Sequence, residues 1–316
     1  MTKYVIRRLL LAIPILILIS MVTYLLIDLM PGDSVDMLVD PSGSAESIER
    51  RREALGLNDP IYTRYIHWIG EVAKGNLGYS TLNNWPVAQQ VGERIIPTLL
   101  LMGSALVVSL LLAFPIGVIS AMKSHSRLDN ILSILTFSGI SLPTFFVGLA
   151  GIYLFSVKLG LVPTSMMQTP GEPFSLWDRI HHLILPVSVL AIHQVALYMR
   201  LIRSSVLDVL NKDFIRTARA KGLAERWVIL RHALRNSLLP VVSVLGVQLP
   251  SLFSGAVVTE QIFAWPGIGR LLVGSVYGRD YPVLMAIIMA TAVLVVLSNL
   301  LTDIIYAFVD PRIKYD

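Results

Sequence analysis

The sequence has 316 residues, of which 54% are hydrophobic and only 15% are charged. A soluble domain carries nearer a quarter charged residues, and one soluble core of this length cannot bury so much apolar surface. The composition therefore favours a protein whose solvent is lipid. The chain has no cysteine, which excludes disulfides, thiolate metal ligands and cysteine nucleophiles, and the distribution of its modest net charge of +5 says more than the size of that charge.

Six windows of the chain lack Asp, Glu, Lys and Arg over about 20 residues, the length that a helix needs to cross a bilayer. The windows do not alternate with the period of two that is typical of barrel strands. Prolines inside them suit membrane helices, because neighbouring helices satisfy the freed backbone groups. The sequence therefore predicts an all-α polytopic membrane protein with six transmembrane helices. The windows are Leu9–Ile27, Ile95–Met122, Asn130–Val157, Ile180–Met199, Asn236–Thr259 and Tyr281–Thr302.

The first window, within residues 1–30, follows Lys3, Arg7 and Arg8 as a signal peptide does. Its apolar run is too long for such a peptide and no small-residue cleavage site follows, so we interpret it as a retained first helix. With six spans, both termini share a side with residues 123–129 and 200–235, where Lys and Arg concentrate. Because positive residues stay in the cytoplasm, we expect both termini to be cytoplasmic.

Residues 31–94 are expected to form a small helical segment outside the membrane. The stretch "SAESIERRREALGLNDP" predicts a helix between Ser44 as N-cap and Gly56 as stop, and a second helix is predicted with Asp59 as cap and Pro60 in its first turn. The second helix carries three aromatic residues, which either anchor it at the membrane surface or contact an external partner. These aromatics are Tyr62, Tyr65 and Trp68.

The sequence lacks the motifs of nucleotide-binding and hydrolytic sites. Neither a Walker A loop, nor His-Glu-x-x-His, nor Gly-x-Ser-x-Gly occurs, so we predict no catalytic residue and no enzyme activity in this chain. The adjacent His181 and His182 point about 100° apart on a helix, which argues against a shared metal. We therefore predict no metal site.

The segment Arg216–Arg235, "RTARAKGLAERWVILRHALR", combines basic residues with an apolar stripe. Leu223, Trp227, Leu230 and Leu234 are spaced as one face of an amphipathic helix. Gly222 disfavours a helix interior and predicts a helical hairpin with a bend at Gly222–Leu223–Ala224. A loop that only sets topology explains the charge without the stripe, and nucleic-acid binding requires a soluble basic domain. A docking helix on a cytoplasmic protein explains both features.

Polar residues near the last two spans have competing interpretations. Some of them are expected either to line or gate a transport pathway or to bond between helices. These pathway candidates are Gln248, Ser251, Ser254 and Glu260. Others are expected to form structural ion pairs, with a proton relay at Asp303 as the alternative. These ion-pair candidates are Glu260, Arg270, Asp303 and Arg312.

Several motifs resemble the permease subunits of bacterial ABC importers, in particular one of the two permease types of the dipeptide/oligopeptide/nickel branch. They cover nearly the full length in order: "KYVIRRLLLAIPILILIS", "PGD", "GNLGYS", "ERIIPTL", "ISLPTFFVGL", "LGLVPT", "RTARAKGL", "RHALRN", "TEQIFAWPGIGRL" and "NLLTDIIYAFVDPR". The sequence departs from the general importer signature Glu-Ala-Ala-x-x-x-Gly, because residues 216–218 read Arg-Thr-Ala and only Ala218 and Gly222 match.

The resemblance implies the type I ABC importer permease fold, with a core at residues 95–316 and a coupling loop at 200–238. It implies a second homologous permease, two cytoplasmic ATPases that carry ATP and Mg, a lipid-anchored external binding protein, contact with membrane lipid, and no nucleic-acid partner. The chain itself is expected to hold no cofactor. The residues expected to couple to the ATPase are Ala218, Arg219, Gly222, Leu223, Ala224, Glu225, Trp227, Leu230 and Arg231.

The expected function is uptake of dipeptides or oligopeptides by such a complex. Import of nickel or another small solute by the same kind of complex is the first alternative. A self-sufficient secondary transporter is a further one, although the sequence lacks the two related halves and central charges of that class.

Overall fold

The computed structural model describes residues 2–30, 53, 58–248, 250, 252 and 256–309. Within these ranges the regular elements are helices, and an isolated β-bridge joins Tyr79 to Pro86. The predicted all-α fold is confirmed. The helix that was expected between Ser44 and Gly56 lies outside the described residues, apart from residue 53.

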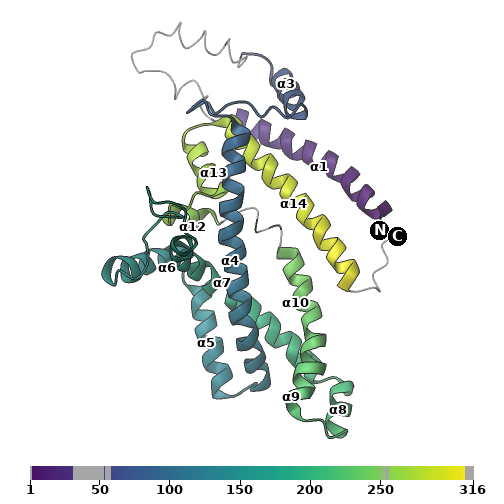
Figure 1. Ribbon diagram of the computed structural model, residues 1–316. Helices are drawn as coiled ribbons and strands as arrows, with labels where there is room; N and C mark the ends of the chain where they lie inside the picture. Colours follow the sequence, from purple (N-terminus) through teal and green to yellow (C-terminus); the bar gives the residue numbers. More distant parts are fainter. Residues whose placement is uncertain are drawn as a thin grey trace.

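Among the described residues, four helices are long and apolar enough to cross a membrane, and two of them, α4 and α7, form the centre of the fold (Figure 1). Gly117 of α4 allows a close approach, since a Cβ there would lie 2.9 Å from Cβ of Ile202 on α7. A buried cluster joins both helices to η2 and α10. The four long helices are α1 (Thr2–Asp28), α4 (Val87–Met122), α7 (Leu176–Leu210) and α14 (Tyr281–Val309).

The third predicted span is not one helix. It is divided into α5 (Arg127–Ser141), α6 (Thr144–Gly151) and the π-helix η1 (Ile152–Lys158), with a bend of 96° between α5 and the α6–η1 pair. The bend falls at Leu142-Pro143, because the residue before a proline is pushed out of the helical region and Leu142 is extended, with φ −91° and ψ 131°. The continuous helix predicted over Asn130–Val157 was therefore wrong.

The fifth predicted span corresponds only in part to described structure. Helix α10 (Leu234–Gln248) is 15 residues long, and most of the following seven residues lie outside the described ranges. The chain resumes with α12 (Val257–Ile262) and α13 (Ile268–Tyr277). The described residues thus contain four spanning helices, or five if the bent pair is one span, and the count of six stays a prediction.

The N-terminal helix α1 packs against α14 (Figure 1), and α3 (Ile61–Ala73) packs against α1. Tyr65 and Trp68 of α3 stack around Tyr24 of α1. The expected second helix is confirmed, but Pro60 and not the predicted Asp59 is at its N-cap position, with no side-chain cap bond. Two of the three predicted aromatics therefore contact the protein itself, whereas Tyr62 is exposed.

Candidate coupling site

The basic segment forms a helical hairpin at the end of the molecule opposite α3 and α13 (Figure 1). Its elements are α8 (Asp213–Ala220), α9 (Glu225–Trp227) and the π-helix η2 (Val228–Ala233). We call the residues 213–233 the coupling hairpin. The bend lies at Gly222–Leu223–Ala224, as the sequence predicted.

Gly222 makes this bend possible. Its φ is +78°, in the left-handed region that favours glycine. The Gly222 N–H donates to the Arg219 carbonyl at 2.9 Å and the Leu223 N–H donates to the Ala218 carbonyl at 3.4 Å. These two bonds form a Schellman motif, which ends α8 and redirects the chain.

The hairpin has a small core of its own. Ile215 and Ala218 of α8 pack against Val228 and Ala233 of η2, and this cluster rests on the last turn of α7. Ala218, one of the two positions that match the importer signature, is therefore buried inside the hairpin. Its side chain faces the core of the hairpin, whereas it was expected among the residues that couple to the ATPase.

An ion pair closes the bend. Both nitrogens of one edge of the Arg219 guanidinium donate to the Glu225 carboxylate, Nη2 at 2.6 Å and Nε at 3.1 Å. Hydrogen bonding to Arg219 lowers the pKa of Glu225, and the same contact raises the pKa of Arg219. These two predicted coupling residues therefore bind each other in this structure and hold α8 beside α9.

Three apolar side chains of the predicted stripe are exposed on the hairpin. Leu223, Trp227 and Leu230 are 44%, 52% and 61% accessible, and Phe214 of α8 adds an exposed aromatic that the stripe had not included. The fourth predicted member, Leu234, is buried in the α4–α7 cluster. The π-helix η2 precedes it and has wider turns than an α-helix, so the 3.6-residue spacing does not carry one face through to Leu234.

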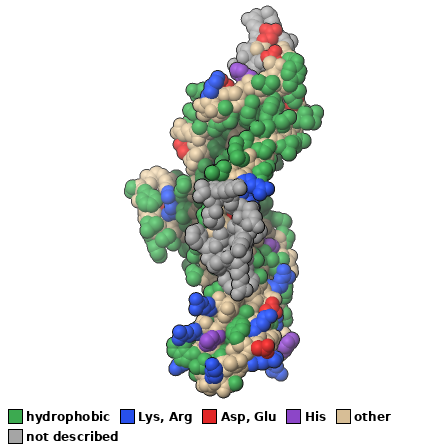
Figure 2. Space-filling view, turned by 90° about the vertical axis from the view of Figure 1, so that its right-hand side faces the viewer, with side chains coloured by type: hydrophobic (Ala, Val, Ile, Leu, Met, Phe, Trp, Pro, Cys, Tyr) green, Lys and Arg blue, Asp and Glu red, His purple; other side chains and the backbone are tan. Residues whose placement is uncertain are grey.

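Basic residues surround this exposed apolar group. The Arg226 guanidinium lies 5.9 Å from the Trp227 ring centroid, and other Lys and Arg side chains of the segment are exposed. Figure 2 shows Lys and Arg gathered at this lower end of the molecule, below surfaces that are largely hydrophobic. The exposed basic residues are Arg216, Arg219, Lys221, Arg226, Arg231 and Arg235.

Glu260 is fully buried at the other end of the fold. Its carboxylate accepts from Thr98 Oγ1 at 2.8 Å and from the Arg270 backbone N–H at 3.0 Å. The Arg270 guanidinium instead donates to the Ala264 carbonyl at 2.6 Å. The predicted ion pair between the Glu260 and Arg270 side chains was therefore wrong, because Arg270 bonds to Glu260 through its backbone N–H. The enclosed carboxylate holds the loop after α12, and its predicted role in gating stays a prediction.

The lack of a side chain at Gly267 leaves room for the Glu260 carboxylate. A Cβ at Gly267 would lie 2.3 Å from the Glu260 carboxyl carbon. The neighbouring Trp265 is also buried, and its Nε1 donates to the Pro97 carbonyl of α4 at 2.9 Å. The "EQIFAWPGIGRL" motif is thus a packed structural element on α4.

The other predicted polar residues have mixed outcomes. Asp303 forms an ion pair with Arg8 of α1 at 3.0 Å, so a structural ion pair is present, with a partner that the sequence had not indicated. Gln248 is half-buried at the end of α10. Ser251, Ser254 and Arg312 lie outside the described residues. The pathway assignment therefore stays a prediction.

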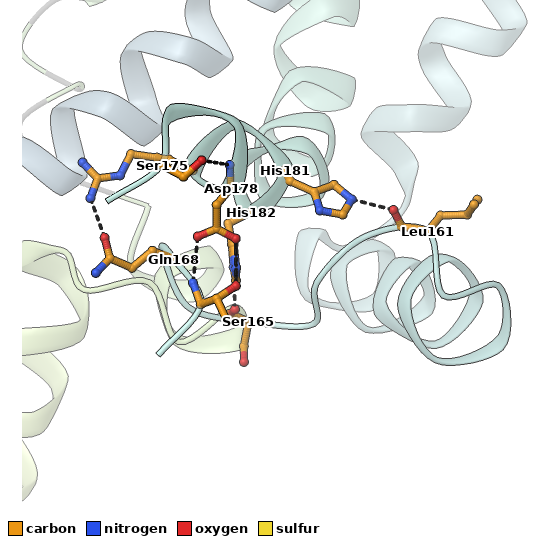
Figure 3. A network of polar contacts seen from close by, with 9 residues as sticks. Leu161, Ser165, Gln168, Ser175, Asp178, His181 and His182 are labelled. Atoms are coloured by element: carbon orange, nitrogen blue, oxygen red, sulfur yellow. Dashed lines mark hydrogen bonds and ion pairs between the residues drawn. The ribbon is translucent and has the colours of Figure 1, made fainter. Parts of the chain in front are cut away.

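The two adjacent histidines contact different segments (Figure 3). His181 Nε2 lies 2.7 Å from the Leu161 carbonyl, and His182 Nδ1 lies 2.9 Å from the Ser165 carbonyl. Asp178 lies between the loop and His182. These contacts fasten the loop before α7 to that helix. Among the described residues, no group of three or more His, Asp or Glu is arranged to hold a metal.

A bundle of long apolar helices with a basic hairpin at one end is the architecture of a helical integral membrane protein. The chain belongs to the family of inner membrane components of binding-protein-dependent transport systems. The family model with that description matches residues 113–315, and the N-terminal model of such components matches residues 1–102. The resemblance inferred from the sequence motifs is confirmed.

Similar proteins extend over the whole chain. The sequence is 45% identical to the oligopeptide transport system permease protein AppB of Bacillus subtilis, with full coverage of both chains. It is 39% identical to the glutathione transport system permease protein GsiC of Escherichia coli K12 over 315 residues, again with full coverage of both. The chain is thus similar over its whole length both to a permease of an oligopeptide transport system and to a permease of a glutathione transport system.

Solved structures share the fold. One is a chain from inward-facing conformations of the MetNI methionine ABC transporter, with a TM-score of 0.59 and 16% identity over 71% of this chain and 98% of that one. Another is from an amino acid ABC transporter crystallised with histidines, with a TM-score of 0.54 and 18% identity over 70% of this chain and 94% of that one. This likeness confirms a fold of the ABC importer permease type.

Proposed function

We propose that this chain is one of two homologous permeases of an ATP-driven importer and that the coupling hairpin docks on a cytoplasmic ATPase. The observation that carries the proposal is the exposed group Leu223, Trp227 and Leu230, surrounded by arginines at the end of a hairpin with its own core. Aromatic and aliphatic anchors with arginine at the rim are typical of protein interfaces. Burial of these apolar side chains in a groove of a partner protein would remove them from water and so stabilise the complex.

The proposed assembly contains further subunits that supply the chemistry. Two ATPases bind and hydrolyse ATP with Mg, a second permease completes the pathway, and a lipid-anchored binding protein delivers substrate from outside. The chain itself contributes neither a cofactor nor a catalytic group. We place it in the bacterial cell membrane with both termini and the hairpin in the cytoplasm, because Lys and Arg concentrate on that side.

The proposed substrate is a peptide. The support is that AppB is an oligopeptide permease and GsiC a glutathione permease, and glutathione is itself a small peptide. Uptake of nickel or another small solute by the same assembly is the alternative. A binding assay on the external binding protein of the system decides between them, since peptide affinity without nickel affinity supports the proposal and the reverse contradicts it.

The substitution Trp227→Glu tests the docking role. It places a charge in the centre of the exposed apolar group, and we expect the ATPase recovered with the permease to fall about tenfold, as for an interface hot spot. Trp85→Glu is the matched control, because Trp85 is similarly exposed at 56% but lies at the opposite end of the fold. Equal ATPase recovery with both variants would contradict the docking role.

A self-sufficient transporter is the rival from another class. The purified chain alone in liposomes distinguishes the two. The proposal expects transport only after the ATPases and the second permease are added. Substrate uptake by the chain alone, driven by an ion gradient, would contradict it.

A further inference from the structure

The buried carboxylate of Asp129 is bonded to three separate parts of the chain. Asp129 lies in the first turn of α5 and is only 3% exposed. Arg203 of α7 donates to both of its oxygens, from Nε at 3.0 Å and from Nη2 at 2.8 Å. Ser120 Oγ of α4 donates to Oδ1, and the His125 backbone N–H donates to Oδ2 at 3.0 Å. One side chain therefore ties α4, the α4–α5 turn and α5 to α7.

The turn between α4 and α5 is shaped around this carboxylate. His125 has φ +62°, an uncommon conformation for a residue with a side chain, and its N–H is held by Asp129. Ser126 caps α5 by accepting from the Asp129 N–H at 3.2 Å. Removing the charge of Asp129 thus weakens the turn together with the link to Arg203, whereas the Ser126 cap uses the backbone N–H of residue 129 and is kept.

Helix α5 has few buried side chains, and Asp129 supplies its most buried contact with the rest of the protein. Asp129 is its only fully buried residue, whereas Leu132, Thr136 and Gly139 reach α7 in partly buried positions. Most of its large apolar side chains face outward. A two-point contact between a guanidinium and a buried carboxylate favours one relative geometry of the two partners. The contact with Arg203 therefore contributes, with the packing at Leu132 and Gly139, to how α5 is oriented against α7.

The same stretch of α7 carries the coupling hairpin. Arg203 lies two turns before Val209 and Leu210, on which the hairpin core rests. Ile202, next to Arg203, and Val206, between Arg203 and Val209, pack in one cluster with Ile229 of η2 and Val118 of α4. Figure 1 shows the ends of α4 and α5 at the same end of the molecule as α8 and α9. Packed side chains thus connect the hairpin to the turn of α7 that carries Arg203.

We infer that the Asp129–Arg203 ion pair is the joint through which movement of the coupling hairpin is passed from α7 to α5 and on to the bent α6–η1 pair. Asp129 and Arg203 are positioning residues, since they act through helices. The inference rests on the proposed docking of the hairpin on an ATPase. It adds that α5 moves together with the hairpin because of one buried carboxylate.

Distance measurements in the full importer test the joint. The chain has no cysteine, so Ser138→Cys on α5 and Asn211→Cys, at the end of α7 just before the hairpin, introduce the only labelling sites in this subunit. In the otherwise native chain, the distance between the labels should change by less than about 2 Å on ATP binding, the scale of packed-helix shifts. With Asp129→Asn the same distance should become ATP-dependent. A native distance that changes strongly with ATP, or an unchanged distance in Asp129→Asn, overturns the inference.

Transport supplies the second readout. In proteoliposomes, Asp129→Asn should reduce substrate uptake about tenfold while the ATPases remain bound, a typical size for a change in coupling between distant sites. Asp208→Asn is the matched control, since Asp208 is an exposed carboxylate on the same part of α7, and it should transport normally. Wild-type uptake in Asp129→Asn overturns the joint alone, whereas failure of the native chain to bind ATPases overturns the proposed function.

A variant that keeps the charge covers the case in which Asp129→Asn does not fold. Arg203→Lys retains one cationic donor but loses the two-point contact of the guanidinium. It should give an intermediate loss of uptake and an intermediate ATP-dependence of the distance. Native behaviour in both readouts would show that the two-point contact is not the joint.

Discussion

Arg219 and Glu225 lie on either side of the bend at Gly222 and bind each other through two hydrogen bonds, at 2.6 and 3.1 Å. The pair joins the end of α8 to the beginning of α9. It fixes the angle at which Leu223 and Trp227 are presented. An exposed pair of this kind adds less than about 1 kcal/mol to stability, so its role is orientation.

Removing the pair should therefore weaken ATPase docking without unfolding the protein. For Arg219→Ala we expect ATPase affinity to fall by up to about fivefold, corresponding to the upper end for an exposed ion pair. Glu225→Gln should give a similar loss, and the double variant should lose little more than either single variant, because both remove one interaction. Titration of purified ATPase against the reconstituted permease measures this. Fully additive losses would show that the two residues contact the ATPase separately.

The pH dependence of the pair has a definite sign. Arg219 lowers the pKa of Glu225 from its ordinary value of 4.5. A carboxylate with a lowered pKa contributes to the folded hairpin above that ordinary value, and the contribution is lost as pH falls through the lower, folded value. ATPase docking in native protein and in Glu225→Gln should therefore keep a constant ratio between pH 6 and pH 8. A ratio that changes across this window would contradict the assignment.

Gly222 should be replaceable only by residues that tolerate its backbone. Its φ of +78° costs Ala roughly 1 kcal/mol of strain, although a Cβ there meets no atom within 4 Å. Proline fixes φ near −65° and removes the N–H that bonds to Arg219, so it breaks the bend. We expect uptake in the order Gly222→Asn above Gly222→Ala above Gly222→Pro, with the last near background. Substantial uptake in Gly222→Pro would show that the bend is dispensable.

Glu260 should be a stability residue. Glu260→Ala removes the acceptor of Thr98 Oγ1 and of the Arg270 N–H, and each buried donor left without an acceptor costs about 1–3 kcal/mol. We expect a large drop in thermal stability in detergent, measured with the assembled importer, and a smaller drop for Glu260→Gln, which keeps an acceptor oxygen. Native stability of Glu260→Ala combined with altered transport would instead assign the residue to gating.

Because Asp303 forms an ion pair with Arg8, we expect Asp303 to have a structural role and not to carry protons. In Asp303→Asn we expect ATP-dependent uptake to persist, with a modest loss of stability because the link between α14 and α1 is weakened. Uptake with and without a proton gradient is the measurement. Uptake that depends on the gradient in native protein and is abolished in Asp303→Asn would establish a relay.

Local chemistry made much of the hairpin predictable. Gly222 indicated the bend, and the spacing of Leu223, Trp227 and Leu230 indicated an apolar face, because both signals act within one or two turns. Leu234 was misplaced because the π-helix before it changes the residues per turn, which the spacing of apolar residues alone does not reveal. Charge-free windows found the long helices but not the 96° bend at Pro143, since proline is tolerated in membrane helices elsewhere in this chain.

Contacts between distant parts of the chain were not predictable from one sequence. Asp303 was expected to pair near the C-terminus, yet its partner is Arg8, at the other end of the chain. Asp129 and Arg203 are likewise 74 residues apart. Charged residues near window edges have many possible partners, and only the packing of α5 and α1 against their neighbours selects one.

Photocrosslinking at Leu230 tests the central claim, that the hairpin docks on an ATPase, most directly. A photoreactive phenylalanine analogue at Leu230, which is 61% exposed, should crosslink to the ATPase subunit in membranes that contain the whole importer. The same analogue at Leu234, which is buried 4 residues further along, should give no such crosslink. Crosslinks to lipid alone at Leu230, or equal ATPase crosslinking at both positions, would contradict the account.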